Sequence, residues 1–202
     1  MITHYVNLVG WREIQHLPGR HVVDTASLKL LVKIVAGVNV AKNPGVCFDF
    51  SNVNRNSAIL LTSGPISQNF RYHVLPIIMD TNLQLPESVC KDLTTIKNLE
   101  TIIFGISSPK QNILALECQS YAPNADIHCL GAAVDLHFET PGNLTLMRVF
   151  SKLNLIWVFF LFFKPKRSIK KIFTSLKEIL MILIFKSERD CFRNYVRTKL
   201  TI

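Results

Sequence analysis

Three polar stretches directly follow apolar runs of strand length, and they carry side chains that could do chemistry. The runs and the residues after them are 57–62 with Gly64, 101–106 with Ser107 to Gln111, and 127–130 with Gly131 to Asp135. The carboxyl ends of parallel strands meet at one edge of a sheet, where the ligands of such sheets bind. The sequence therefore predicts an active site at this edge.

Asp24, Lys110, Gln111 and Asp135 are the candidate functional side chains. A carboxylate such as Asp24 can act as a general base, but an aspartate before Thr25 is also a residue type that caps a helix. Lys110 and Gln111 fall in the first turn of an expected helix, where polar side chains are commonly solvated. Asp135 follows a turn of small residues, which suits a helix N-terminus or a ribose contact. The residues alone leave both interpretations open.

A metal site is not expected. His128, Cys129, Asp135 and His137 are ligand types and lie close in the sequence, but their spacing fits no common zinc pattern. In a strand, His128 and Cys129 would point to opposite faces.

Cysteine usage indicates a reducing compartment. The five cysteines include no Cys-x-x-Cys pair, so neither a disulfide framework nor a zinc knuckle is predicted. Cys47 and Cys118 are expected to be small buried side chains. The N-terminus has no basic stretch followed by an apolar run of signal length, which predicts a cytoplasmic protein.

The elements that position these residues alternate between strands and helices. Pro109 suits the first turn of a helix that runs to about Ser120, with Ser108 as its N-cap. With the flanking strands this makes a strand-helix-strand unit. Weaker helix signals cover 24–35 and 68–75. The alternation predicts an α/β domain with a mostly parallel sheet and helices on both faces.

Composition excludes a disordered chain. Of 202 residues, 49% are hydrophobic and 18% are charged, and the formal net charge is +9. Such a chain can bury a sizeable core. The cations cluster with aliphatic residues and no nucleic-acid-binding motif is present, so no nucleic-acid partner is expected.

The chain changes character near Pro141. The apolar runs 153–163 and 179–185 are each shorter than the roughly 20 residues that span a bilayer. From Ile169 the apolar residues follow helical spacing with lysines between them, which predicts a helix on an anionic membrane surface. Two alternatives stay open. The runs could be core helices, or 144–163 could be a tilted span that buries Arg148 and Lys152.

Gly105 to Gln111 (GISSPKQ) and then Gly131 to Asp135 (GAAVD) resemble motifs of the WecG/TagA/CpsF-type bacterial glycosyltransferases, glycosyltransferase family 26. Leu153 to Arg167 resembles the family's C-terminal element. The resemblance covers about Asp24 to Lys171. It implies a Rossmann-like domain in 1–142 and a helical, basic, membrane-facing appendage in 143–202 that completes the active site.

The resemblance implies an inverting transfer of an N-acetylmannosamine-type or related sugar from UDP to an undecaprenyl-diphosphate-linked sugar, in the biosynthesis of cell-surface polysaccharides. Asp24 matches the general base, and Gln111 and Asp135 match residues that contact the UDP-sugar. Lys42 stands where relatives carry a substrate-contacting arginine. Arg167 and Lys170 match cations placed over the UDP diphosphate. No metal or other cofactor is implied.

Several positions depart from the family pattern, and relatives have a longer N-terminal region, of which Tyr5 to Asn7 resemble a remnant. The substituted positions are Asn112 and Ile156 in place of glutamate, Thr145 in place of arginine, and Phe160 in place of a basic residue. These departures keep a second interpretation open, a non-catalytic relative that binds UDP-sugar or membrane as a partner in polysaccharide assembly. The resemblance also implies a peripheral location on the inner face of the bacterial cell membrane, with self-association as a further expectation.

Overall fold

The computed structural model describes residues 1–40, 48–66, 70–75, 84–139, 149–150, 158, 161–162 and 165–200. The chain divides into two compact units. Unit 1 comprises Met1–His4, Leu17–Arg20 and Gly45–Leu144, and unit 2 comprises Tyr5–His16, His21–Pro44 and Thr145–Ile202. The segment that begins at Thr145 therefore belongs to the same unit as two stretches near the N-terminus.

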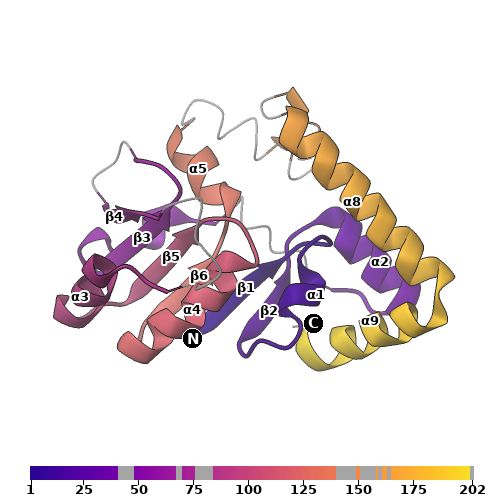
Figure 1. Ribbon diagram of the computed structural model, residues 1–202, viewed down its shortest axis with the longest axis horizontal. Coiled ribbons are helices and arrows are strands. Elements are labelled where there is room, and N and C mark those ends of the chain that lie inside the picture. Colours follow the sequence, from indigo (N-terminus) through magenta and orange to yellow (C-terminus); the bar gives the residue numbers. More distant parts are fainter. Residues whose placement is uncertain are drawn as a thin grey trace. The chain divides into compact units, whose positions relative to one another are not determined.

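The described strands form a six-stranded sheet in the order β2-β1-β6-β5-β3-β4 (Figure 1). The strands are β1 (Ile2–Val6), β2 (Arg20–Val23), β3 (Ala58–Thr62), β4 (Arg71–Val74), β5 (Thr101–Gly105) and β6 (Asp126–Cys129). Every pair from β1 across to β4 is parallel. The predicted α/β class with a parallel sheet is confirmed.

The central strands of unit 1 are the ones that the apolar runs predict. All five residues of β3 are buried, as are the last four of β5. A parallel strand covered on both faces is apolar throughout, so its sequence is a continuous run rather than an alternation. The strand predictions over 57–62, 101–106 and 127–130 are therefore confirmed with ends shifted by one residue.

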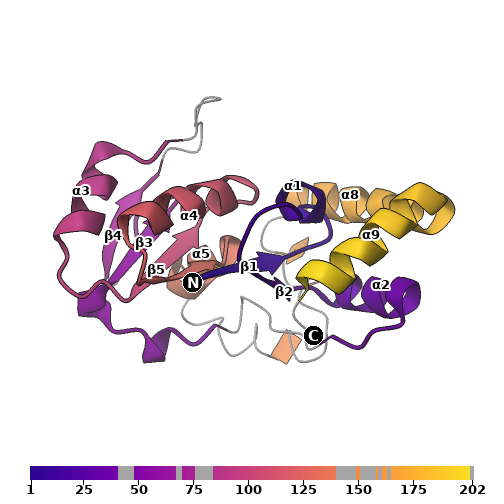
Figure 2. The same ribbon diagram turned by 90° about the horizontal axis from the view of Figure 1, so that it is seen from below.

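Helices cover both faces of these strands. The helices α3 (Glu87–Thr95) and α4 (Lys110–Tyr121) contact each other on one side of the sheet (Figure 2). Ile102 and Phe104 of β5 pack into the core with them. Gly105 is on the opposite face, because side chains alternate along a strand. There it meets Val134 of the helix α5 (Ala132–Glu139).

Gly105→Ala is expected to destabilise the protein. A Cβ at Gly105 would lie 2.8 Å from the Cβ of Val134, so α5 would have to move away from β5. Overpacking of this kind costs about 1–3 kcal/mol in the free energy of unfolding. Gly64→Ala is the matched control, because a Cβ there meets nothing within 4 Å. Urea unfolding of both variants measures the difference, and equal stabilities would contradict the close contact.

Two expectations about unit 1 are wrong. The segment 68–75 is not a helix, because Arg71–Val74 form the edge strand β4, whose side chains are largely exposed. Ser108 is not the cap of α4 either. The residue before that helix is Pro109, which makes no side-chain capping hydrogen bond. The short 3-10 helices Phe50–Asn52 and Arg55–Ser57 precede β3.

Unit 2 is built on helices from both ends of the chain. These are α1 (Trp11–Ile14), α2 (Ala26–Ala36), α8 (Pro165–Ile184) and α9 (Lys186–Lys199). The rings of Phe192 and Tyr195 on α9 lie 5.1 and 5.5 Å from the buried ring of Trp11. The Tyr195 hydroxyl also bonds Nδ1 of the buried His21 at 3.0 Å. Residues far apart in the sequence therefore share one core.

The predicted helices over 24–35 and from Ile169 onward are confirmed as α2 and α8. Within the described part of the chain, no helix combines the length and the apolar character that crossing a membrane requires. The run 153–163 and the alternative span over 144–163 lie mostly outside the described residues.

Candidate functional site

The carboxyl edge of the unit 1 strands contains a topological switch point. Strands β3 and β5 are neighbours, with Thr62 in register with Gly105. The chain continues from β3 to β4 on one side and from β5 through α4 to β6 on the other. These connections diverge, so the turns after β3 and β5 lie at the point where the ligands of such sheets usually bind.

Gln111 lies at this edge in the first turn of α4. Its side chain is 3% exposed, and Nε2 donates to the backbone oxygen of Cys129 at the end of β6, 3.1 Å away. Oε1 of Gln111 is buried and has no hydrogen-bond partner within the described part of the chain. The structure therefore brings Gln111 against the turn that leads from β6 to α5, as the sequence predicts.

Gly131 shapes that turn. Its φ is +62°, a left-handed conformation that favours glycine. A Cβ on Gly131 would lie 3.5 Å from the backbone oxygen of Ile106 and 3.7 Å from Nε2 of Gln111. The missing side chain therefore leaves the turns after β5 and β6 in close approach around the Gln111 carboxamide.

Unpartnered oxygens collect at the start of α4. Besides Gln111, Oδ1 of Asn112 and the hydroxyl of Ser108 are buried without a hydrogen-bond partner among the described residues. Buried polar atoms are nearly always bonded. The Gln111 oxygen can only accept, so a group that donates hydrogen bonds, such as a sugar hydroxyl or an amide N–H, would satisfy it.

Asp24 lies in unit 2, directly after β2. Its backbone N–H donates to the oxygen of Val6 at 2.9 Å, and its side chain is half-buried. The cap of α2 is the next residue, Thr25, whose side-chain oxygen accepts from the N–H of Leu28. The capping interpretation of Asp24 is therefore wrong, since a neighbour takes that role.

The other predicted site residues are placed only in part. Lys42 lies outside the described residues, as do the side chains of Asp135 in α5 and Arg167 in α8. Lys170 is exposed on α8. Gln111 and Asp135 belong to unit 1, whereas Asp24, Arg167 and Lys170 belong to unit 2.

Three of the residues weighed as metal ligands, His128, Cys129 and His137, have packing roles. Ile127 and Cys129 face the core under α4, so His128 faces the other side, where its ring lies 4.9 Å from that of Phe48. Burial lowers the pKa of His128. The ring of His137 stacks on Phe50 at 4.2 Å. No group of three or more His, Cys, Asp or Glu side chains in the described ranges could hold a metal ion.

The buried cysteines behave as core residues. Cys118 and Cys129 have no exposed surface, and burial raises the pKa of both thiols. The expectation for Cys118 is therefore confirmed, while Cys47 lies outside the described residues.

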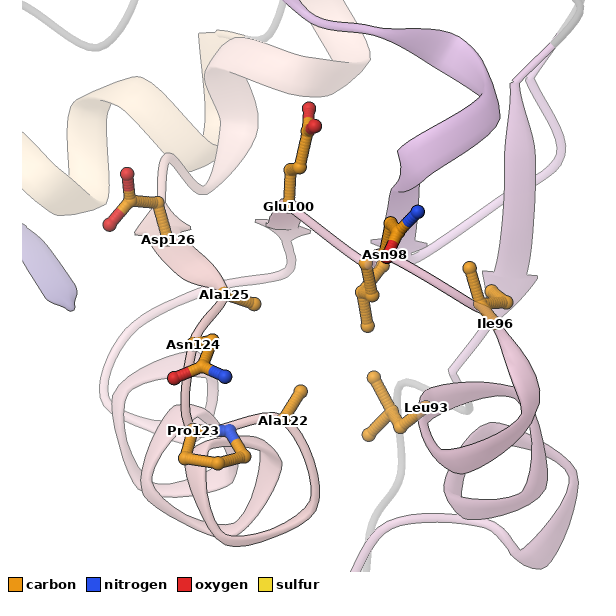
Figure 3. A pocket seen from close by; sticks show the side chains of 10 residues that line it. Leu93, Ile96, Asn98, Glu100, Ala122, Pro123, Asn124, Ala125 and Asp126 are labelled. Carbon is orange, nitrogen blue, oxygen red and sulfur yellow. The ribbon is translucent and has the colours of Figure 1, made fainter.

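A hollow of about 530 Å³ lies at the opposite, amino edge of the sheet, between the ends of α3 and α4 (Figure 3). It is lined by apolar side chains such as Leu93 and Ile96 and by the polar residues Asn98 and Asn124. Its two carboxylates, Glu100 and Asp126, point away from its middle (Figure 3). Ser57 donates to Glu100, and the N-terminal amino group bonds Asp126.

Sequence reasoning missed the partners of Asn112 and Asn7. Asn112 Nδ2 lies 2.8 Å from Nδ1 of His4, a residue 108 positions earlier, and no local pattern signals that contact. Asn7 directly follows β1, and its side-chain oxygen accepts from the N–H groups of Val9 and Gly10. That oxygen therefore stabilises a turn.

Comparisons with models of known protein families, with curated protein sequences and with solved structures each gave no match.

Proposed function

We propose that this chain is an inverting glycosyltransferase that transfers an N-acetylmannosamine-type or related sugar from UDP to a polyprenyl-diphosphate-linked sugar. The observation that supports it most is the Gln111 carboxamide, buried beside Gly131 at the carboxyl edge of the sheet with an unpartnered acceptor. A Rossmann-like domain binds a nucleotide at this place. The resemblance at 105–111 and 131–135 supplies the substrate class.

In the proposed reaction, Asp24 takes the proton of the acceptor hydroxyl as that oxygen attacks the anomeric carbon of the sugar. The bond from this carbon to the UDP oxygen breaks at the same time, and UDP leaves with the electron pair. Gln111 and Asp135 hold the donor. Arg167 and Lys170 stabilise the charge that develops on the diphosphate, a type of interaction that contributes several kcal/mol in a dry site.

We further propose that α8 faces a membrane as part of the C-terminal appendage, which would place the protein at the inner face of the bacterial membrane. An apolar stripe on α8 is exposed, with Ile169, Phe173, Leu176 and Leu180 between 46% and 68% accessible. Exposed contiguous apolar surface of this kind commonly marks a contact site.

The charges of α8 favour an anionic partner for that stripe. Its four lysines, at positions 166, 170, 171 and 177, are exposed. Glu178, the acidic residue of this helix, faces inward and accepts a hydrogen bond from Arg12 at 2.8 Å. Partial burial acts to lower the pKa of Arg12, but Glu178 and Glu188 outweigh it and raise that pKa. The acidic charge is thus neutralised inside unit 2, and lysines dominate the outer surface.

Gln111→Leu is expected to weaken binding of UDP-sugar about tenfold, because one well-formed hydrogen bond to the ligand is worth about 1.5 kcal/mol. Isothermal titration calorimetry with UDP and with UDP-N-acetylmannosamine measures the dissociation constants. Ser57→Ala is the control, since it removes a bond to Glu100 at the opposite edge of the sheet.

UDP release from a panel of UDP-sugars, with and without a soluble lipid-diphosphate-sugar acceptor, tests the activity itself. Acceptor-dependent release by the wild-type chain is the expected result. UDP binding without any release would instead favour the non-catalytic relative. No binding of UDP by the wild-type chain would contradict both.

A further inference from the structure

Two neighbouring amides tie the first turn of α4 to two different strands of unit 1. Gln111 donates to the backbone oxygen of Cys129 on β6 at 3.1 Å. Asn112, 1% exposed, places Nδ2 2.8 Å from Nδ1 of His4 on β1. The strands themselves are joined at this level, because His4 is the register partner of Cys129. These contacts form a closed ring through four residues: Gln111, Cys129, His4 and Asn112.

The hydrogen bonds of His4 define the state of its ring. Its side chain has no exposed surface, and Nε2 lies 2.9 Å from the backbone oxygen of Pro18. A carbonyl oxygen can only accept, so Nε2 carries a hydrogen, and Nδ1 accepts from the Asn112 amide N–H. His4 therefore links the loop at Pro18 to Asn112 at the start of α4, with its ring held in one orientation.

The loop at Pro18 and Gly19 leaves the imidazole of His4 little freedom to move. Gly19 has a φ of +115°, and a Cβ there would lie 3.2 Å from Nε2 of His4 and 2.8 Å from the backbone oxygen of Ile2. The loop backbone therefore packs directly against β1 and the imidazole. Because His4 is held in this way, its contact with Asn112 fixes the Asn112 side chain and the helical turn that carries Gln111.

We propose that His4 is a positioning residue for Gln111: through Asn112 it fixes the first turn of α4 so that the Gln111 carboxamide presents its unpartnered oxygen to the donor. This role rests on the proposed function for its ligand. His4 does not touch the ligand, so its effect passes through the two amides.

The experiment compares His4→Phe with His4→Gln. Phenylalanine keeps a ring but can neither accept from Asn112 nor donate to Pro18, whereas a glutamine amide offers one acceptor and one donor. The dissociation constant for UDP-N-acetylmannosamine, measured by calorimetry, is expected to rise about tenfold in His4→Phe and to stay within about threefold in His4→Gln. Asn112→Leu breaks the same contact from α4 and should match His4→Phe, which covers the case that His4→Phe does not fold.

His73→Phe separates positioning from a general loss of stability. It makes the same chemical change on β4, where His73 bonds Asp92 at 3.1 Å. Its dissociation constant is expected to stay within about threefold of wild type. Equal weakening in His73→Phe and His4→Phe, or unchanged affinity in both His4→Phe and Asn112→Leu, would overturn the proposal.

A ligand-free measurement separates this proposal from the proposed function. Hydrogen exchange of the Gln111 side-chain amide, followed by NMR, is expected to be slow in the wild type and in His4→Gln and fast in His4→Phe. Slow exchange in all three would show that His4 does not position Gln111. If the wild type fails to bind the donor while this exchange pattern holds, the donor assignment fails and the positioning of Gln111 stands.

Discussion

Asp24→Asn is expected to lower acceptor-dependent UDP release by at least about 100-fold, because general base catalysis contributes about 10²–10⁴-fold and an amide cannot take the proton. The substitution keeps the size of the side chain. It also keeps the backbone N–H that donates to Val6 and the Thr25 cap of α2. The variant should therefore be folded, as its melting curve can show.

Thr25→Ala is the matched control for Asp24→Asn. Loss of the cap should reduce the free energy of unfolding by about 1 kcal/mol and leave the rate of transfer unchanged. The two substitutions are thus expected to have opposite effects. Asp24→Asn should lose activity and keep stability, whereas Thr25→Ala should lose stability and keep activity. Transfer by Asp24→Asn within threefold of wild type would exclude Asp24 as the base.

The sequence predicts the central strands because their environment is uniform. A strand such as β5, covered by α4 on one face and α5 on the other, needs apolar residues throughout and ends in small or polar turn residues. The edge strand β4 has no such uniform environment. Arg71–Val74 are mostly exposed and mixed in polarity, so a local pattern does not separate them from a helix turn.

β1 and β2 could not be predicted from local patterns because their buried polar residues have distant partners. His4 on β1 bonds Asn112, and His21 on β2 bonds Tyr195. A histidine with no exposed surface is compatible with a core only when such partners exist. Their identity depends on the tertiary fold, which no window of sequence contains.

The same reasoning applies to the candidate site. Gln111 could be placed at the carboxyl edge because the apolar run, the turn and the helix are contiguous in the sequence. The ring of contacts through His4 could not, since it joins the N-terminal strand to α4. The grouping of 145–202 with Trp11 was missed for that reason too, because Phe192 and Tyr195 pack on Trp11 across the length of the chain.

That packing changes how the appendage should be tested. Removing everything after residue 142 would strip Phe192 and Tyr195 from the buried ring of Trp11 and unfold unit 2. Substitutions on the exposed stripe of α8 avoid this effect. Phe173 and Leu180 are 68% and 55% accessible, so charged residues there leave the core intact.

Phe173→Glu/Leu180→Glu is expected to weaken binding to vesicles of phosphatidylcholine with anionic phosphatidylglycerol about 100-fold. Each apolar side chain that enters the lipid contributes about 1.5 kcal/mol, and together they account for about 3 kcal/mol. Co-sedimentation with the vesicles measures the partition coefficient, and high salt should weaken binding of the wild type because the lysines contribute about 1 kcal/mol each.

Leu30→Glu/Ile34→Glu on α2 provides the matched control for the α8 pair. These side chains are 59% and 61% exposed and lie one turn apart beside Lys29 and Lys33. Unchanged vesicle binding here, with loss in the α8 pair, would assign the contact to α8 rather than to apolar surface in general. The alternative outcome is that the wild type does not bind vesicles and sediments as a dimer, which Phe173→Glu/Leu180→Glu dissociates. In that case a second copy of the chain covers the stripe, and the membrane assignment is wrong.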